Sequence, residues 1–198
     1  MTTEHQRAHF ATAYESTPPW DIGRPQPAFV ELLERGEIRG RVLDVGCGTG
    51  EHSLMAAAAG LDATGVDIAE AAIAQAQQKS RDRDLGARFF VWDVFALDQL
   101  REQFDTVLDC GLFHIFDDDQ RPAYVEGLRA VLPSGGRFCM LCFSDQQPGE
   151  GGPRRVREDE IRQSFSDGWR IDRLERSTLH VTFDPNGARA WLACLTRT

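Results

Sequence analysis

The sequence contains no long apolar run. Its longest weakly apolar stretch, residues 54–61, is far shorter than the ~20 residues that a membrane-spanning helix needs. The first ten residues, MTTEHQRAHF, lack the basic start and apolar block of a secretory signal. We therefore expect a cytoplasmic protein with no membrane partner.

Positive charge is scarce. Lys and Arg together number 22 against 31 Asp and Glu, so the formal net charge is -9 at pH 7. A chain with this balance repels the phosphate backbone of nucleic acids. We expect no nucleic-acid partner.

Cysteine is also scarce, with five residues scattered along the chain. The one close pair, Cys139 and Cys142, lies in RFCMLCF, which has the pattern of a buried strand. Positions i and i+3 of a strand face opposite sides of the sheet, so we interpret both thiols as core residues. A chain of 198 residues buries enough surface to fold without disulfides or metals, and we predict no metal site.

Short apolar runs alternate with helical patterns through the middle of the chain. This alternation is typical of right-handed crossovers, a parallel sheet and helices on both faces, so it predicts a doubly wound α/β domain. The expected strands are residues 41–45, 62–67, 87–93, 105–110 and 136–143, and the expected helices are residues 51–59, 69–80, 97–103 and 120–132.

The two flanks depart from this alternation. The proline-rich residues 14–26 are expected to form an ordered, extended strap before a helix that begins near Pro27. The C-terminal part predicts a helix, three β-like runs and an antiparallel hairpin that brings the mostly parallel sheet to seven strands. Its elements are a helix at 157–165, runs at 169–176, 178–183 and 188–196, and a DPNG turn at 184–187 between the last two runs. We predict one domain, 1–198, in which 1–36 cover the site and 37–198 form the core.

The stretch LDVGCGTG follows the first expected strand. Glycines at 46, 48 and 50 allow positive φ and close contact between a ligand and the backbone. Ligands of doubly wound sheets bind at such strand-to-helix turns. The spacing is GxGxG and not the GxGxxG of dinucleotide sites, and no GK(S/T) follows. Asp67 ends the second strand, where a carboxylate suits a ribose diol.

Three segments, LDVGCGTG, GVDIAEAAI and VWDVFAL, together resemble the motif series of class I S-adenosylmethionine (SAM) dependent methyltransferases. The resemblance implies a Rossmann-like fold, SAM as the cofactor and S-adenosylhomocysteine as its product. It implies that the glycine turn passes under the amino-acid part of the cofactor, that Asp67 binds the ribose, and that Asp93 meets the adenine amine. The residues expected to bind the cofactor are Trp20, Arg24, Asp44, Gly46, Cys47, Gly48, Gly50, Asp67, Ile68, Asp93, Val94, Phe95 and Cys110.

The N-terminal stretch PPWDIGRPQP resembles a segment of the thiol, halide and thiopurine methyltransferase group. That resemblance implies that Trp20 covers the methionine end of the cofactor, where an indole face attracts a sulfonium by ~0.5–2 kcal/mol. The alternative is an aromatic clip that packs the N-terminus onto the domain. Arg24 either pairs with the cofactor carboxylate or with a neighbouring acid.

The stretch DCGLFHIF, in which the fourth strand ends, is expected to face the methyl acceptor. It lacks the (Asp/Asn/Ser)-Pro-Pro-(Tyr/Phe) motif of amine methyltransferases, which argues against nucleobase and protein amines. His114 is predicted to be a general base, with a hydrogen bond to the loop backbone as the alternative. Tyr14 and Phe10 are predicted to roof the acceptor pocket. In segment 144–156, Arg154 and Arg155 either bind an acidic acceptor or lie on a loop surface.

The predicted function is methyl transfer to a small molecule, preferably a thiol or another soft nucleophile. An O-methyltransferase of a phenol or quinol is the next alternative. A non-catalytic SAM-binding protein and a nicotinamide-dependent oxidoreductase are alternatives from other classes. Monomer and homodimer both stay open.

Overall fold

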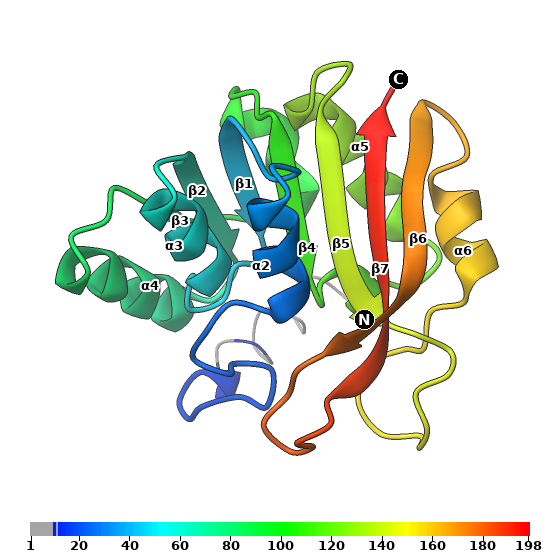
Figure 1. Ribbon diagram of the computed structural model, residues 1–198, viewed down its shortest axis with the longest axis horizontal. Coiled ribbons are helices and arrows are strands. Elements are labelled where there is room, and N and C mark those ends of the chain that lie inside the picture. The colour runs from blue at the N-terminus through cyan, green and yellow to red at the C-terminus, as the bar shows by residue number, and fades with distance from the viewer. Residues whose placement is uncertain (1–9, 11) are drawn as a thin grey trace.

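One mixed sheet forms the centre of the molecule (Figure 1). The computed structural model describes residues 10 and 12–198. In this part of the chain seven strands lie in the order β3-β2-β1-β4-β5-β7-β6; the first five are parallel, and β7 runs antiparallel to both β5 and β6. The strands are β1 Arg41–Val45, β2 Asp62–Asp67, β3 Arg88–Val91, β4 Thr106–Cys110, β5 Arg137–Phe143, β6 Trp169–Leu179 and β7 Ala188–Arg197. The predicted doubly wound α/β fold with a C-terminal hairpin is confirmed.

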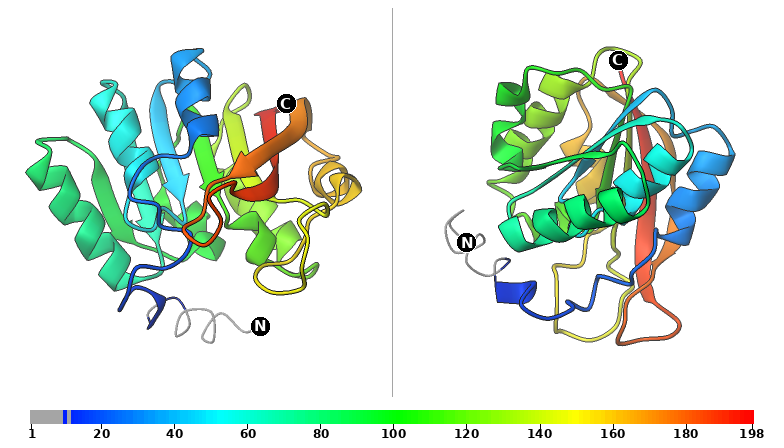
Figure 2. Two further views of the ribbon diagram at one scale, coloured as in Figure 1. Left: turned by 60° about the horizontal axis from the view of Figure 1, so that its bottom comes forward. Right: turned by 90° about the vertical axis from the view of Figure 1, so that its left-hand side faces the viewer.

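Helices cover both faces of the sheet (Figure 2). On one face are α2 Pro27–Glu34, α3 Glu51–Ala58 and α4 Glu70–Asp82; on the other are η1 Val94–Leu100, α5 Arg121–Val131 and α6 Glu158–Ser164. A short 3-10 turn, η2 Phe113–Ile115, follows β4. Among the helices of the described residues, none combines the length and the apolar character that crossing a membrane requires.

The central strand β5 contributes alternate residues to two apolar cores. Phe138, Met140 and Cys142 belong to the core under α5 and α6, and Cys139 and Leu141 belong to the core under α2. Cys139 and Cys142 are both buried. The alternation confirms that these two thiols face opposite sides of the sheet and pack in separate cores.

The C-terminal hairpin differs from the prediction. The first two β-like runs form one strand, β6, which ends at Leu179 opposite Ala188, so the predicted strand over 178–183 is wrong beyond residue 179. The reason is a competing partner: the Gln26 side chain accepts from the His180 backbone N–H at 2.8 Å and donates to its carbonyl at 2.9 Å. Past Leu179 the chain is therefore held by the strap, through Gln26, and not by β7.

The helix predicted at 97–103 is also displaced. A 3-10 turn, η1, covers Val94–Leu100 instead, and it begins where the Asp93 carboxylate accepts from the Phe95 N–H at 3.0 Å. It ends at Arg101, whose φ is +53°. Both boundaries depend on single local conformations that apolar spacing does not encode.

Three segments gather beyond the carboxyl ends of the parallel strands (Figures 1 and 2). They are the strap at 14–26, segment 144–156 after β5, and the hairpin loop at 180–187. The Pro19 carbonyl accepts from the Thr182 N–H at 2.9 Å, and Gln26 holds His180 as described above. The strap and the hairpin loop are therefore joined over this end of the sheet.

The turn before α3 generates a stability prediction. Gly50 has φ +86°, and a Cβ built there would lie 2.7 Å from the Phe89 ring and 2.9 Å from the Ala76 Cβ. Gly60 has a similar φ of +82° with nothing within 4 Å. Gly60→Ala is therefore expected to lower the free energy of unfolding by ~1–2 kcal/mol, because alanine must adopt the left-handed conformation. Gly50→Ala is expected to lower it by a further ~1–3 kcal/mol, because its Cβ overpacks the space beside Phe89. Urea unfolding of both variants measures this difference. An equal loss of unfolding free energy in the two variants would show that the Phe89 ring moves aside without cost.

Candidate functional site

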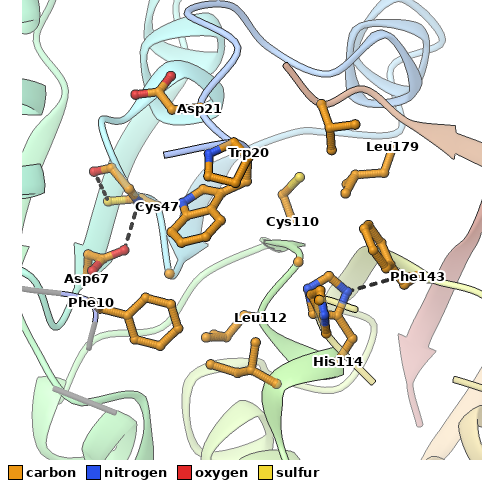
Figure 3. Close-up of a pocket in the computed structure, with 18 of the residues that line it drawn as sticks. Phe10, Trp20, Asp21, Cys47, Asp67, Cys110, Leu112, His114, Phe143 and Leu179 are labelled. Carbon is orange, nitrogen blue, oxygen red and sulfur yellow. Dashed lines mark hydrogen bonds between the residues drawn. The ribbon is translucent and has the colours of Figure 1, made fainter. Parts of the chain in front are cut away.

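A cavity of about 910 Å³ lies at the carboxyl ends of the parallel strands, under the strap and the two C-terminal segments. Figure 3 shows Cys47 and Asp67 on one side of it, Phe143 and Leu179 on the other, and Trp20 between. Nearly all the predicted site residues line it: Tyr14, Trp20, Arg24, Gly46, Cys47, Gly48, Asp67, Ile68, Asp93, Val94, Phe95, Cys110 and His114.

The glycine turn is held by the carboxylate at the end of β2. Asp67 Oδ2 accepts from the Gly48 N–H at 2.8 Å, and its Oδ1 accepts from the Ala69 N–H at 2.9 Å. Gly46 and Gly48 have φ of +64° and +52°, as their places in a tight turn require. Burial raises the pKa of Asp67, and the N–H bonds oppose that rise. One carboxylate thus joins the β1–α3 turn to the start of α4 at the cavity wall.

Two predicted cofactor residues do not line the cavity. The Asp44 carboxylate is buried and accepts from the Ser53 N–H at 3.2 Å and from its hydroxyl at 3.0 Å. Burial raises the pKa of Asp44 to about 7. Gly50 lies against Phe89 and is the residue before α3. Both therefore shape the glycine turn from beneath it, and neither lines the cavity.

Tyr14 lies on the glycine-turn side of the cavity. Its ring packs with Ala69 and Ala72, and a Cβ on Gly48 would stand 2.7 Å from its hydroxyl oxygen. That oxygen accepts from Trp20 Nε1 at 3.1 Å. Burial, and then the Asp67 carboxylate, raise the pKa of Tyr14, so it keeps its proton. Tyr14 thus lines the cavity beside the glycine turn, and its expected place over the acceptor stays a prediction.

Arg24 has no acid beside it among the described residues. Its guanidinium approaches His180 Nδ1 at 3.4 Å, at the exposed edge of the cavity. Of the two alternatives for Arg24, pairing with a neighbouring acid is not observed.

A buried carboxylate shapes the loop after β4. Asp109 Oδ1 accepts from the Leu112 N–H at 2.9 Å, and its Oδ2 accepts from the Phe113 N–H at 3.2 Å and from the Tyr124 hydroxyl at 2.7 Å. Burial raises the pKa of Asp109 to about 6. Three bonds to one side chain thus fix the turn that presents His114 to the cavity.

His114 is held through the ring nitrogen that points away from Gly111. Its Nδ1 accepts from the Phe143 N–H at 3.0 Å, and burial lowers the pKa of His114 to about 3. The ring is therefore neutral, and the hydrogen-bond network assigns its one proton to Nε2. A Cβ on Gly111 would lie 3.4 Å from this nitrogen. Nε2 is then a potential hydrogen-bond donor with no lone pair to accept a proton, so the geometry favours the alternative of a backbone hydrogen bond over the predicted base role.

Several lining residues have no sequence signal. Asp21 accepts from the Thr49 hydroxyl at 2.8 Å, and the Lys79 ammonium bonds that hydroxyl at 2.7 Å. These contacts join the strap, the glycine turn and α4. His52 packs edge-on against the Phe29 ring and also lines the cavity.

The two ends of the cavity differ in character. The end beside the glycine turn presents carboxylates, among them Asp67 and Asp93. The opposite end is lined by apolar side chains from β5 and the hairpin: Phe143, Leu179, Val181 and Phe183. The hairpin residues were not foreseen, because the 180–187 loop reaches the site only through the tertiary fold.

Comparisons with known proteins agree with this geometry. A family of methyltransferase domains matches residues 42–136. The chain is 31% identical over 193 residues to the 2-heptyl-1-hydroxyquinolin-4(1H)-one methyltransferase of Mycobacteroides abscessus, covering 92% of this chain and 85% of that protein. It is 29% identical over 150 residues to probable thiol methyltransferase 2 of Arabidopsis thaliana, covering 72% and 64%. A solved structure described as the conversion of a disulfide bond into a thioacetal group during echinomycin biosynthesis superposes with a TM-score of 0.89 and 34% identity, over 98% of this chain and 93% of that one.

The protonation of His114 can be tested through stability. Below about pH 6.5 the unfolded chain protonates this histidine, whereas the folded chain does so only near pH 3. The free energy of unfolding therefore falls as pH drops through this window, by up to about 1.4 kcal/mol per pH unit for one proton. His114→Gln removes that proton uptake, so its profile between pH 6 and 4.5 is expected to be flatter than that of the wild type. Parallel profiles from denaturant titrations would mean that the folded ring is protonated.

Proposed function

The chain belongs to the class I SAM-dependent methyltransferases, in the group with small-molecule, thiol and thiopurine acceptors, and we propose that its own acceptor is a small apolar molecule whose reacting atom is an anion, with a thiolate as the first choice. SAM is the cofactor and a small molecule is the substrate. Membership of this family decides against the nicotinamide-dependent oxidoreductase that the sequence left as an alternative. The observation that carries the proposed acceptor is the hydrogen bond from the Phe143 N–H to His114 Nδ1, which makes the other ring nitrogen a donor at the apolar end of the cavity.

The acid-lined end of the cavity fits SAM. Asp67 lies at the wall with lone pairs beyond its two backbone bonds, which suits a ribose diol. Ile68, Val94 and Phe95 line a wall suited to the adenine ring, beside Asp93. When bound, SAM supplies a methyl group on a sulfonium sulfur, which a nucleophile takes as the carbon–sulfur bond breaks and its electron pair stays on sulfur.

The residues of this chain contribute alignment and exclusion of water. The strap and the hairpin loop cover the cavity, and apolar side chains surround its acceptor end. Methyl transfer to a soft nucleophile gains chiefly from such positioning in a dry site. Trp20 lies between the two ends, where its ring can face both reactants (Figure 3).

The protonation of the side chains that line the cavity limits the kind of acceptor that the site suits. His114 offers an N–H, Tyr14 keeps its hydroxyl proton, and burial raises the pKa of the Cys110 thiol. These side chains do not take a proton near neutral pH. An acceptor that ionises by itself suits the site: a thiol, with an ordinary pKa near ~8.5, ionises more readily than a phenol near ~10. The His114 N–H then stabilises the anion at the reacting atom.

An acidic aromatic hydroxyl is the second candidate. The relative from Mycobacteroides abscessus is named for a hydroxyquinolone substrate, and it matches this chain over most of both lengths. Such a hydroxyl meets the same condition, because it can enter as an anion with a flat apolar ring.

A matched acceptor series tests the proposal. Benzenethiol, phenol and aniline share one ring and differ in the reacting atom. With methyl-labelled SAM we expect transfer to the thiol first, slower transfer to phenol and none to aniline, with kcat/KM rising as each acceptor ionises. Transfer to aniline alone would contradict the proposed acceptor. Tight SAM binding without transfer to any thiol or hydroxyl would instead support the non-catalytic alternative. A reaction without protein gives the background.

The ribose role of Asp67 is tested by SAM affinity. Asp67→Ala removes charge-assisted hydrogen bonds worth ~1.5–3 kcal/mol each, so the Kd for SAM is expected to rise roughly 10 to 100-fold or more. The matched control is Asp62→Asn, at the exposed opposite end of the same strand, which should leave the Kd unchanged. Calorimetric titration measures both. Unchanged affinity in Asp67→Ala would place the ribose elsewhere.

A further inference from the structure

We propose that Arg155 is the specificity-determining residue of the acceptor site: it shapes the loop at 147–153 into a wall of the cavity and keeps an unpaired positive charge there, so that acceptors with an anionic reacting atom are preferred. The inference rests on the proposed function, because it explains how this cavity selects the acceptor that the function requires.

The first observation is the set of backbone carbonyls around one guanidinium. Arg155 Nη1 donates to the carbonyls of Gly151 at 2.8 Å and Pro153 at 2.6 Å. Its Nη2 donates to Gly149 at 3.0 Å and Pro148 at 3.3 Å. The planar guanidinium has five N–H donors in a fixed fork, so one side chain can hold carbonyls on several sides of a loop. An ammonium with three donors at one point cannot span the same set.

The second observation is that, although Gln147 is also bonded to Ser144 and Arg189, residues 148–153 form hydrogen bonds to no described residue other than Arg155. Residues 147–153 form neither helix nor strand, and most of their side chains are exposed. Gly149 and Gly152 have φ of +82° and +84°, so flexible backbone accounts for two of the bends. The guanidinium therefore acts as a small core for a segment that has no apolar one.

The third observation is where this loop lies. Gly149, Gly151, Pro153 and Arg155 itself line the cavity. The Arg155 guanidinium carbon is 5.7 Å from the centre of the Phe143 ring, and Phe143 belongs to the apolar end of the cavity. A change at residue 155 is thus transmitted directly to the wall that the acceptor meets.

The charge of Arg155 distinguishes it from its neighbours. Arg154 and Arg121 both pair with Glu160, and Arg154 also pairs with Asp118 at 2.7 Å. No carboxylate of the described residues forms an ion pair with Arg155, whose partners are neutral carbonyls. Carbonyl dipoles satisfy its N–H groups but leave its net charge. The charge and the buried His114 ring interact, since Arg155 is a contributor, after burial, to the lowered pKa of His114.

The cavity is therefore polarised along its length. Asp67 and Asp93 border the end that fits the cofactor, and the Arg155 guanidinium borders the end that fits the acceptor. Asp117 and Arg154 also line the cavity, and Arg154 is paired with Asp118 and Glu160. In a site with an effective dielectric constant well below that of water, such an arrangement favours an anion at the acceptor end over a neutral molecule of the same shape. The sequence left two alternatives for Arg155, direct binding of an acidic acceptor or a place on a loop surface. In place of both, we infer that Arg155 holds the loop and that its charge acts on the acceptor.

Two ligands that differ in charge and little in shape test the inference. Benzenethiol, at a pH where it is ionised, is compared with methyl phenyl sulfide, its neutral methylated form. Dissociation constants are measured by calorimetry with S-adenosylhomocysteine bound, so that no methyl transfer occurs. Arg155→Gln is expected to weaken thiolate binding roughly 10-fold more than sulfide binding. Arg155→Lys should keep the preference for the thiolate but weaken both ligands several-fold, because the ammonium cannot hold the loop.

The matched control is Arg189→Gln. The Arg189 side chain also donates to a backbone carbonyl of this region, that of Gln146 at 3.1 Å, but it is exposed and does not line the cavity. Its variant should bind both ligands as the wild type does. Thermal unfolding and SAM affinity of all three variants report whether the fold and the cofactor end are intact.

The possible outcomes separate the role of Arg155 from the proposed acceptor class. Equal losses for thiolate and sulfide in Arg155→Gln would overturn the selective role of the charge, and unchanged affinities would overturn the inference entirely. Loss of the thiolate preference in Arg155→Lys would also contradict it. If the wild type binds SAM but neither ligand, the proposed acceptor class fails and the inference fails with it, whereas thiolate binding that ignores residue 155 leaves the proposed function standing.

Discussion

The carboxylate of Asp67 is the point from which the site is organised, because its two oxygens hold the Gly48 and Ala69 amides at the junction of two strands and two helices. The carboxyl ends of parallel strands lie at one edge of the sheet, so the turns that follow them are neighbours. One carboxylate there can accept from the backbone amides of two such turns. Tyr14 packs beside this junction, and Trp20 binds Tyr14. The covering strap thus depends on the same carboxylate that is expected to bind the cofactor.

Closure of the acceptor end depends on contacts between distant parts of the chain. Gln26 and His180 are 154 residues apart and exchange two hydrogen bonds, and Pro19 accepts from Thr182 nearby. The C-terminal hairpin ends its ladder where these bonds begin. The ends of the parallel strands supply the side of the cavity beside the glycine turn, the hairpin loop and segment 144–156 supply the opposite side, and the strap contacts both.

Protonation in the site follows from burial and backbone hydrogen bonds. His114 accepts from Phe143, which leaves a donor facing the cavity, and Asp109 fixes the turn that carries it. Arg155 adds charge at the same end. The chemistry that we propose for the acceptor end is that of hydrogen-bond donors and a cation. A histidine that suggests a base from sequence becomes a potential donor when its other nitrogen accepts a backbone N–H.

The sequence by itself determined the alternating strands and helices, the glycine turn, and the positions of Asp67 and Asp93 at the ends of strands. Spacing and residue type within a few positions encode these features. It did not show that Asp44 and Gly50 lie beneath the turn, that Tyr14 lies beside the glycine turn, or that β6 ends at Leu179. Each depends on a partner brought close only by folding. The tautomer of His114 and the carbonyl partners of Arg155 were likewise decided by tertiary structure, since a side chain's chemistry is set by what occupies its remaining hydrogen-bonding atoms.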